Sequence, residues 1–325
     1  MRLAAVVEPD AERAAAAGAE WGVPVFASAE SCLAARDRGE VQVEAASVCT
    51  PTSSHFAVAQ ALLRGGLDVL IEKPIATSVA QATELIELAA RAGRVLQTGH
   101  LERFNPAVIA TEPLLNQPMF FEAHRLSVFS PRSLDVDVVL DLMVHDLDIV
   151  LNMVQSPVQS LHAVGLPILS RKVDIANVRV EFESGCVANF TASRVSTERV
   201  RKLRFFQPHQ YVSIDYARQD LLVIDVSRAA QAGPEAMAAA AAQAQSTGSG
   251  FSGSGFPGLN IEKPRVEAGE PLRLEIDSFL ECVRTRGTPR VTGEDGRAAL
   301  ALALEINAAI TDHAERAGLR AMMQG

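Results

Sequence analysis

Residues 69–74, Val-Leu-Ile-Glu-Lys-Pro, place the strongest constraint on the fold of this chain. The run of branched apolar residues predicts a strand buried on both faces, as in a parallel sheet. Pro74 cannot continue a central strand, so the chain must leave the sheet there. Because open α/β sheets bind ligands at the carboxyl ends of their strands, we expect Glu72 and Lys73 at a ligand-binding rim. A surface ion pair at a strand end is the alternative.

Residues 1–100 alternate short apolar runs with helical segments, which predicts a doubly wound parallel sheet. Besides residues 69–72, the expected strands cover residues 2–7, 45–49 and 95–99. The expected helices follow the capping residues Asp10, Ser28 and Ser78 and the turn at residues 50–55. We therefore expect residues 1–100 to form a dinucleotide-binding domain.

Glu8 indicates that this domain is incomplete at its amino end. In a dinucleotide fold, an acid at the end of the second strand holds the adenosine ribose, and a glycine fingerprint lies about 20 residues before it. Only seven residues precede Glu8. We therefore expect the first strand and the glycine loop to lie upstream of Met1, or the chain to be a fragment.

Two later segments, residues 248–253 and 253–258, also match the GxGxxG pattern. No strand precedes either of them, so we interpret both as parts of a flexible loop.

From residue 101 to residue 325 the pattern changes to strands with little helix between them, which predicts a large open antiparallel sheet covered by helices on one face. The expected strands cover residues 120–128, 161–169, 175–182, 186–195, 202–206, 211–216 and 221–226. Residues 229–258 read as a helix fragment and a mobile loop. Amphipathic helices at residues 272–286 and 294–318 finish this second domain, which we expect to bind substrate and to mediate oligomerisation.

Composition excludes several classes of protein. The formal net charge of −9 argues against a general binder of nucleic acid or anionic membranes. No apolar run approaches the roughly 20 residues of a membrane span, and no signal peptide is evident. The four cysteines are far apart in the sequence, which is typical of buried thiols in a cytoplasmic protein rather than of disulfides or zinc ligands.

A second group of polar residues lies in Asp141-Leu-Met-Val-His145-Asp-Leu-Asp148. Asp141 and His145 are four residues apart and share one face of a helix. A carboxylate one turn away can orient the imidazole and favour its protonated form, as a general base requires. The alternative is a capped helix whose histidine only packs. A metal site is disfavoured, because three ligands on one short helix rarely converge.

A basic cluster follows at Arg194, Arg199, Arg201, Lys202 and Arg204. Guanidinium groups match phosphate oxygens, so the cluster could receive the diphosphate of a nucleotide sugar. The favoured alternative is that these residues are solvated charges of an edge strand, since alternation sends only every second side chain to one face.

Three motifs in this order resemble the glucose-fructose oxidoreductase, inositol dehydrogenase and rhizopine-catabolism (Gfo/Idh/MocA) family of NAD(P)-dependent oxidoreductases. They are Thr50-Pro51 through His55, Glu72-Lys73-Pro74, and Asp141-x-x-x-His145-x-x-Asp148. The resemblance implies a Rossmann-type domain followed by an α+β domain. Residues 100–106, His-Leu-Glu-Arg-Phe-Asn-Pro, are most similar to the branch that oxidises the 3-hydroxyl of UDP-N-acetylglucosamine for lipid A synthesis.

The resemblance implies roles for individual residues. Lys73, His145 and Asp141 would be catalytic. The cofactor-binding residues would be Glu8, Thr50, Pro51, His55, Glu72 and Lys73. Glu8 would repel a 2′-phosphate and so favour NAD over NADP. Arg103 and Asn105, just beyond the last parallel strand, are expected to contact a sugar or nucleotide-sugar substrate.

Elementary chemistry assigns the proton transfer. With ordinary pKa values of about 6.5 for His and about 10.4 for Lys, His145 is the natural base at neutral pH, while charged Lys73 would stabilise the developing alkoxide. Two other classes of function stay open: a sugar-binding or regulatory relative without turnover, which the absent glycine loop favours, and a structural subunit. An exposed sheet face would favour a homo-oligomer in either case.

Overall fold

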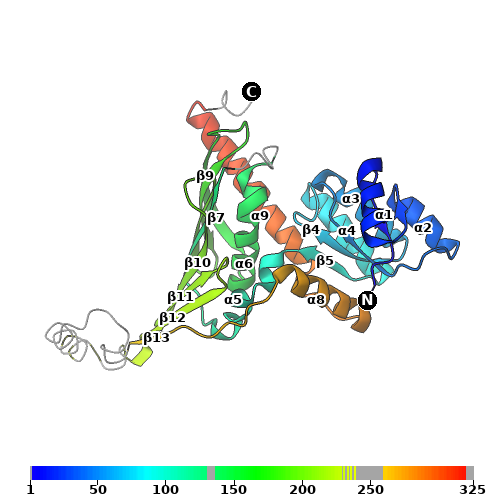
Figure 1. Ribbon diagram of the computed structural model, residues 1–325. Helices are drawn as coiled ribbons and strands as arrows, with labels where there is room; N and C mark the ends of the chain where they lie inside the picture. Colours follow the sequence, from blue (N-terminus) through cyan, green and yellow to red (C-terminus); the bar gives the residue numbers. More distant parts are fainter. Residues whose placement is uncertain are drawn as a thin grey trace. The chain divides into compact units, whose positions relative to one another are not determined.

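The computed structural model describes residues 2–129, 136–228 and 259–319, together with residues 230, 233, 235 and 238 (Figure 1). Its contacts divide the chain into two units. Unit 1 contains residues 1–101 and 272–301, and unit 2 contains residues 102–271 and 302–325. Residues 272–301 thus belong to the first unit, whereas the sequence assigned them to the second domain. The two GxGxxG matches lie outside the described residues.

Unit 1 alternates strands and helices, as the sequence predicts for a Rossmann-like domain. In chain order its elements are β1 (Val6–Val7), α1 (Ala11–Trp21), β2 (Val25–Phe26), α2 (Ala29–Asp37), β3 (Ala45–Val48), α3 (Thr52–Arg64), β4 (Asp68–Glu72), α4 (Val79–Ala92) and β5 (Leu96–Gly99). Helix α8 (Pro271–Thr285) and the first part of α9 (Gly293–Arg316) complete the unit. β1 pairs with β2, and β3, β4 and β5 form a second sheet in that order, all in parallel. No described strand joins the two sheets.

Local sequence accounts for the helix ends in unit 1. Asp10 accepts a hydrogen bond from Arg13 N, and Ser28 accepts one from Ser31 N, so both act as the predicted N-caps. Gly22 follows α1 at φ 63°, a left-handed conformation that favours glycine. β4 is buried along its apolar residues and lies in the middle of its sheet, as the run at residues 69–71 predicts.

Unit 2 is built on one eight-stranded sheet. Its strands are β6 (Phe120–Val128), β7 (Val158–Leu166), β8 (Ile175–Phe182), β9 (Val187–Ser196), β10 (Val200–Gln207), β11 (Gln210–Asp215), β12 (Asp220–Asp225) and β13 (Asn260–Glu262). They are ordered β13-β12-β11-β10-β6-β9-β8-β7. Neighbours are antiparallel, as predicted, except for the parallel pair β6 and β9. β10 lies inside the sheet, so the interpretation of its charges as those of an edge strand is wrong.

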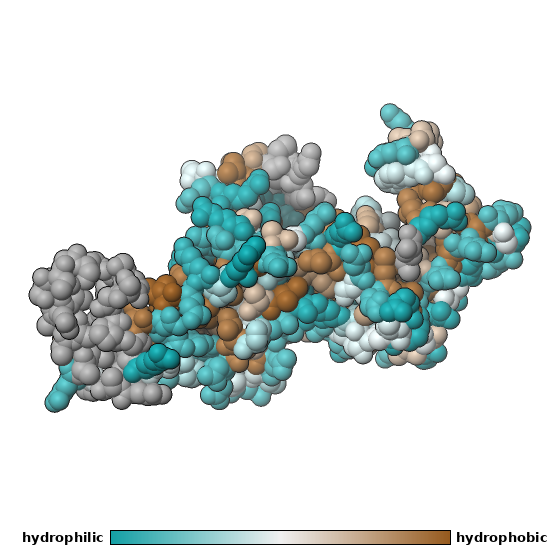
Figure 2. All heavy atoms as spheres, turned by 60° about the horizontal axis from the view of Figure 1, so that its bottom comes forward, coloured by the Kyte–Doolittle hydropathy of each residue, from teal (hydrophilic) through white to brown (hydrophobic). Residues whose placement is uncertain are grey.

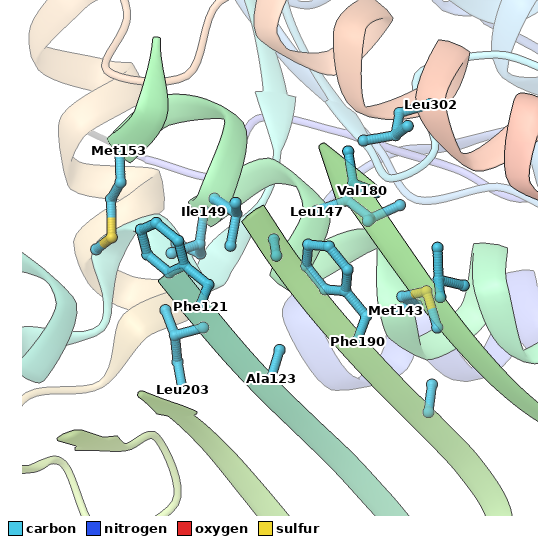
Figure 3. Close-up of a cluster of buried hydrophobic side chains, with 14 of the residues drawn as sticks. Phe121, Ala123, Met143, Leu147, Ile149, Met153, Val180, Phe190, Leu203 and Leu302 are labelled. Carbon is cyan, nitrogen blue, oxygen red and sulfur yellow. The ribbon is translucent and has the colours of Figure 1, made fainter. Parts of the chain in front are cut away.

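Helix α6 (Val144–Val154) and the last part of α9 supply the core that covers one face of this sheet (Figure 3). Phe121, Phe190 and Leu203 point from the strands towards Leu147 and Ile149 of α6, and all five are at most 1% exposed. Buried and half-buried residues alternate along most of β6, so its other face carries both polar side chains, such as Glu122 and His124, and apolar ones, such as Phe120. On the face of the molecule drawn in Figure 2, hydrophobic patches interrupt a largely hydrophilic surface. Among the described helices, none is long and apolar enough to cross a membrane.

Candidate active site

Glu72 and Lys73 lie at the carboxyl end of β4, where the sequence predicts them. Glu72 pairs in register with Gly99 on β5. A Cβ atom at position 99 would lie 3.1 Å from both Cα and Oε2 of Glu72, so glycine leaves room for the carboxylate. Burial raises the pKa of the Glu72 carboxyl, and the backbone N–H and charge of Lys73 partly offset this. Sequence reasoning missed Gly99, because nothing local marks the close approach.

His55 ties the Thr50 turn to the Lys73 turn. Its ring is 1% exposed, with Nδ1 2.8 Å from the carbonyl oxygen of Pro74 and Nε2 2.8 Å from that of Thr50. Both neighbours are backbone carbonyl oxygens, one on each side of the ring. His55 therefore positions both turns through backbone contacts. Its predicted contact with a cofactor stays a prediction.

Glu8 follows β1 and lies at a strand end, as predicted. Its Oε1 accepts hydrogen bonds from the backbone N–H of Asp10 at 2.9 Å and from Arg13 Nη2 at 3.2 Å. Thr50 and Pro51 follow β3, and Pro51 is the N-cap of α3 without a side-chain hydrogen bond to the helix. The buried Oγ1 of Thr50 has no hydrogen-bond partner among the described residues.

Glu275 on α8 is a further polar residue near this rim. It is 0% exposed, and neither carboxyl oxygen has a hydrogen-bond partner among the described residues. Burial and the nearby Glu72 raise its pKa to about 8. Sequence reasoning missed it, although the helical spacing to Phe279 and Cys282 places it on the buried stripe of α8.

In unit 2, Asp141 and His145 lie on consecutive helical segments. Asp141 belongs to a π-helical turn, η3 (Val139–Met143), and His145, 9% exposed, belongs to the first turn of α6. Asp137 Oδ1 accepts hydrogen bonds from the backbone N–H groups of Val139 and Leu140, which fixes the start of η3. π-turns are rare and often lie at functional sites. Sequence reasoning missed Asp137, although aspartate is a residue type that commonly accepts hydrogen bonds at the start of a helix.

A buried ion network lies beside His145. Arg125 on β6 donates two hydrogen bonds to Asp146, with Nε to Oδ2 at 2.8 Å and Nη2 to Oδ1 at 2.9 Å. Its Nη1 donates to Glu102 at 3.0 Å, and its guanidinium lies 5.1 Å from the ring centre of Tyr216. Tyr216 and the three charged residues are at most 6% exposed. Since buried charges need partners, the network fixes the residue next to His145.

Arg103 and Asn105, the predicted substrate residues, are buried in the same region. Arg103 Nη1 donates to Asp148 at 3.4 Å. Asn105 Nδ2 donates to Glu102 at 3.1 Å and to the carbonyl oxygen of Tyr216 at 3.0 Å, and its Oδ1 accepts from Ala107 N. Both side chains thus have protein partners, and their contact with substrate stays a prediction.

The structure groups the predicted residues by unit. Glu8, Thr50, Pro51, His55, Glu72 and Lys73 follow strands or open a helix of unit 1, while Arg103, Asn105, Asp141 and His145 belong to unit 2. Within the described residues, no group of three or more His, Cys, Asp or Glu side chains is arranged to hold a metal ion.

Comparison with known proteins finds similarity along both units. Residues 1–100 match the family described as "Oxidoreductase family, NAD-binding Rossmann fold", and residues 119–207 match the GFO/IDH/MocA C-terminal domain. UDP-N-acetylglucosamine 3-dehydrogenase of Acidithiobacillus ferrooxidans is 34% identical over 97% of this chain and 92% of its own length. A myo-inositol 2-dehydrogenase of Thermotoga maritima is 24% identical over 80% of this chain and 75% of its own.

Solved structures agree on the fold. A structure of the Acidithiobacillus ferrooxidans enzyme has a TM-score of 0.83 at 32% identity, covering 99% of this chain and 91% of that chain. An Agrobacterium radiobacter oxidoreductase, solved with NAD+, L-tartaric acid and magnesium, has a TM-score of 0.75 at 15% identity, covering 95% of this chain and 89% of its own.

Proposed function

The chain belongs to the Gfo/Idh/MocA family of NAD-binding oxidoreductases, and on that basis we propose that it oxidises a secondary hydroxyl of a nucleotide sugar. The 3-hydroxyl of UDP-N-acetylglucosamine is the first candidate. The observation that carries this choice is the 34% identity to a dehydrogenase of that substrate, which extends over 97% of the chain rather than over the nucleotide-binding half alone. A role in lipid A synthesis belongs to the same proposal.

We infer that the cofactor is NAD rather than NADP. The residues of unit 1 fit such a group: Glu8 offers carboxylate oxygens to ribose hydroxyls, and Thr50 Oγ1 is a buried polar atom without a hydrogen-bond partner among the described residues. Glu8 would also repel a 2′-phosphate. When bound, the nicotinamide supplies the chemistry of hydride acceptance.

Side chains of this protein would accept the proton that leaves the substrate hydroxyl. His145 takes the hydroxyl proton as the carbonyl forms, and Asp141 orients the imidazole and stabilises its protonated form. Lys73 stays charged and stabilises the developing alkoxide. Burial of His145 at 9% exposure keeps bulk water from competing for this proton.

The first test is formation of NADH when the chain is mixed with NAD and UDP-N-acetylglucosamine, with NADP compared in the same assay. General acid–base groups typically contribute about 10²- to 10⁴-fold, so Lys73→Met and His145→Asn should each lower kcat at least about 100-fold with folding intact. Lys202→Met and His162→Asn, on the sheet of unit 2, are the matched controls and should keep normal turnover.

Two outcomes would contradict parts of this proposal. Near-normal turnover in Lys73→Met or His145→Asn would remove that residue from the mechanism. Binding of NAD without NADH formation from any tested sugar would favour a sugar-binding relative without turnover. Homo-oligomer formation also stays a proposal; exposed apolar side chains on the strands of unit 2, such as Val164 and Phe206, are compatible with it.

A further inference from the structure

The basic cluster on and between β9 and β10 contains three cations that face a protein acceptor or carboxylate, the exposed Arg199, and Arg201. Arg194 donates to the carbonyl oxygen of Val136 and lies 3.8 Å from Asp174. Lys202 and Arg204 each lie 3.9 Å from a carboxylate on a neighbouring strand, Asp215 and Glu122 respectively. The Nε of Arg201 is buried and has no hydrogen-bond partner among the described residues, and no ion pair within 4 Å joins this side chain to a described carboxylate.

Arg201 points to the helix-covered face of the sheet. It is two and four residues from Leu203 and Phe205, both 0% exposed, and side chains two apart on a strand share a face. Lys202 and Arg204 therefore point to the opposite face. Only part of the basic cluster, including Arg201, is directed towards the side of the sheet that carries α6.

Arg201 also lies directly opposite Arg125 in the register of β10 and β6. Like charges opposite one another in a sheet repel, and Arg125 already engages Asp146 and Glu102 with its own guanidinium. Burial, the charge of Arg125 and that of the exposed Arg199 lower the pKa of Arg201, while Glu102 and Asp146 act in the opposite direction. Because Arg125 already holds both carboxylates, a bound anion would give the Arg201 guanidinium a partner of its own.

The location ties Arg201 to the candidate catalytic helix. Its cross-strand neighbour Arg125 bonds to Asp146, the residue that follows His145. We propose that Arg201, assisted by Arg199, forms the anion subsite that receives the diphosphate of the nucleotide-sugar substrate. This inference rests on the proposed function and adds to it a residue that selects nucleotide sugars over free sugars. A guanidinium suits this task because its planar fork can bond two phosphate oxygens.

Calorimetric titration with UDP and with inorganic pyrophosphate, with and without NAD, tests the subsite without requiring turnover. Arg201→Gln should weaken UDP binding at least about 10-fold, the loss expected for a hydrogen bond between charged groups. Arg201→Lys should lose less, because it keeps the charge but not the fork. Arg204→Gln is the matched control on the same strand and the opposite face, and should bind UDP as the wild type does.

Equal UDP binding by the wild type and Arg201→Gln would overturn the subsite, as would an equal loss in Arg204→Gln, which would indicate general electrostatic attraction. If Arg201→Gln does not fold, UDP binding is measured with Arg199→Gln and Arg201→Lys instead. Wild-type affinity for UDP in both of these variants would overturn the proposed subsite. If the wild type binds no UDP but forms NADH from an uncharged sugar, the subsite fails and the dehydrogenase function stands. If UDP binds through Arg201 but no sugar is oxidised, the dehydrogenase function fails instead.

Discussion

Single residues around the Lys73 turn are held by buried polar groups rather than by the strand alone. His55 contacts the backbone on both sides of the rim, and Gly99 leaves the space that Glu72 occupies. Glu275 adds a second carboxyl beside Glu72, and both have raised pKa values. Two nearby buried carboxyls resist ionising together, so the neutral form of one of them is part of the stable structure.

Glu275 therefore predicts a dependence of stability on pH. Because its pKa rises from 4.5 to about 8 on folding, its favourable contribution is complete below about pH 4.5 and is lost as the pH rises through about 8. The side chain of the Glu275→Gln variant cannot ionise. Between pH 6 and pH 9, the free energy of unfolding should therefore fall more in the wild type than in this variant, and the difference between the two decreases should be ~1.4 kcal/mol or more. Urea unfolding across this range is the measurement.

Glu281→Gln is the control for that comparison, since Glu281 lies exposed on the same helix and pairs with Arg284. It should keep the wild-type pH dependence. Parallel curves for Glu275→Gln and the wild type would mean that Glu275 does not change its charge in this range.

Among the elements, the continuous segment formed by η3 and the first turn of α6 is fixed by hydrogen bonds both at its start and in α6. Asp137 starts the π-turn and also accepts a hydrogen bond from Asn307 Nδ2 on α9. Arg125 fixes the first turn of α6 through Asp146. A buried pair of this kind adds little net stability, but removal of one partner leaves an uncompensated charge.

Arg125→Met should therefore destabilise unit 2 by ~3 to 5 kcal/mol, measured by urea unfolding. The double variant Arg125→Met/Asp146→Asn should recover part of the lost stability, because it also removes the charge of one carboxylate that has lost its partner. Arg204→Gln breaks a cross-strand pair whose side chains are 39% and 35% exposed, and it should cost at most ~1 kcal/mol. A similar small loss in Arg125→Met would contradict the structural importance of the network.

For the whole molecule, sequence periodicity predicts the elements well. The expected strands at residues 120–128 and 175–182 have the observed bounds of β6 and β8, and the caps at Asp10 and Ser28 are confirmed. These features depend on neighbouring residues only. The interior position of β10 depends on pairing with distant strands, so the charge pattern of β10 alone led to the wrong interpretation.

For the candidate site too, sequence reasoning found the local patterns but not the features that depend on distant residues. The Lys73 motif and the Asp141-His145 helix are local patterns, and the sequence contains both. The environment of Glu275 depends on contacts such as that of Gln97 Nε2 with the Glu275 carbonyl oxygen, between residues 178 positions apart. Arg201 differs from its basic neighbours through its register opposite Arg125, which the local sequence does not reveal.

A substitution of Phe279 would test whether α8 and the first part of α9 belong to unit 1. It is 3% exposed and belongs to one apolar cluster with Leu70 and Val95. Phe279→Ala should lower the free energy of unfolding of unit 1 by ~3 to 5 kcal/mol. Leu272→Ala, at an exposed site of the same helix, should have a small effect. If NAD protects the wild type against unfolding, weaker protection of Phe279→Ala would locate the damage in unit 1.

The discontinuous make-up of unit 1 also sets an order of events during synthesis. The ribosome makes β4 and β5 early, but it makes Phe279, Cys282 and Val283, which pack on Leu70 and Val95, only after the whole sheet of unit 2. Domains generally fold as units, beginning with the amino-terminal part of the chain. Residues 1–101 therefore keep part of their apolar surface uncovered until the sheet of unit 2 and then residues 272–301 have been synthesised.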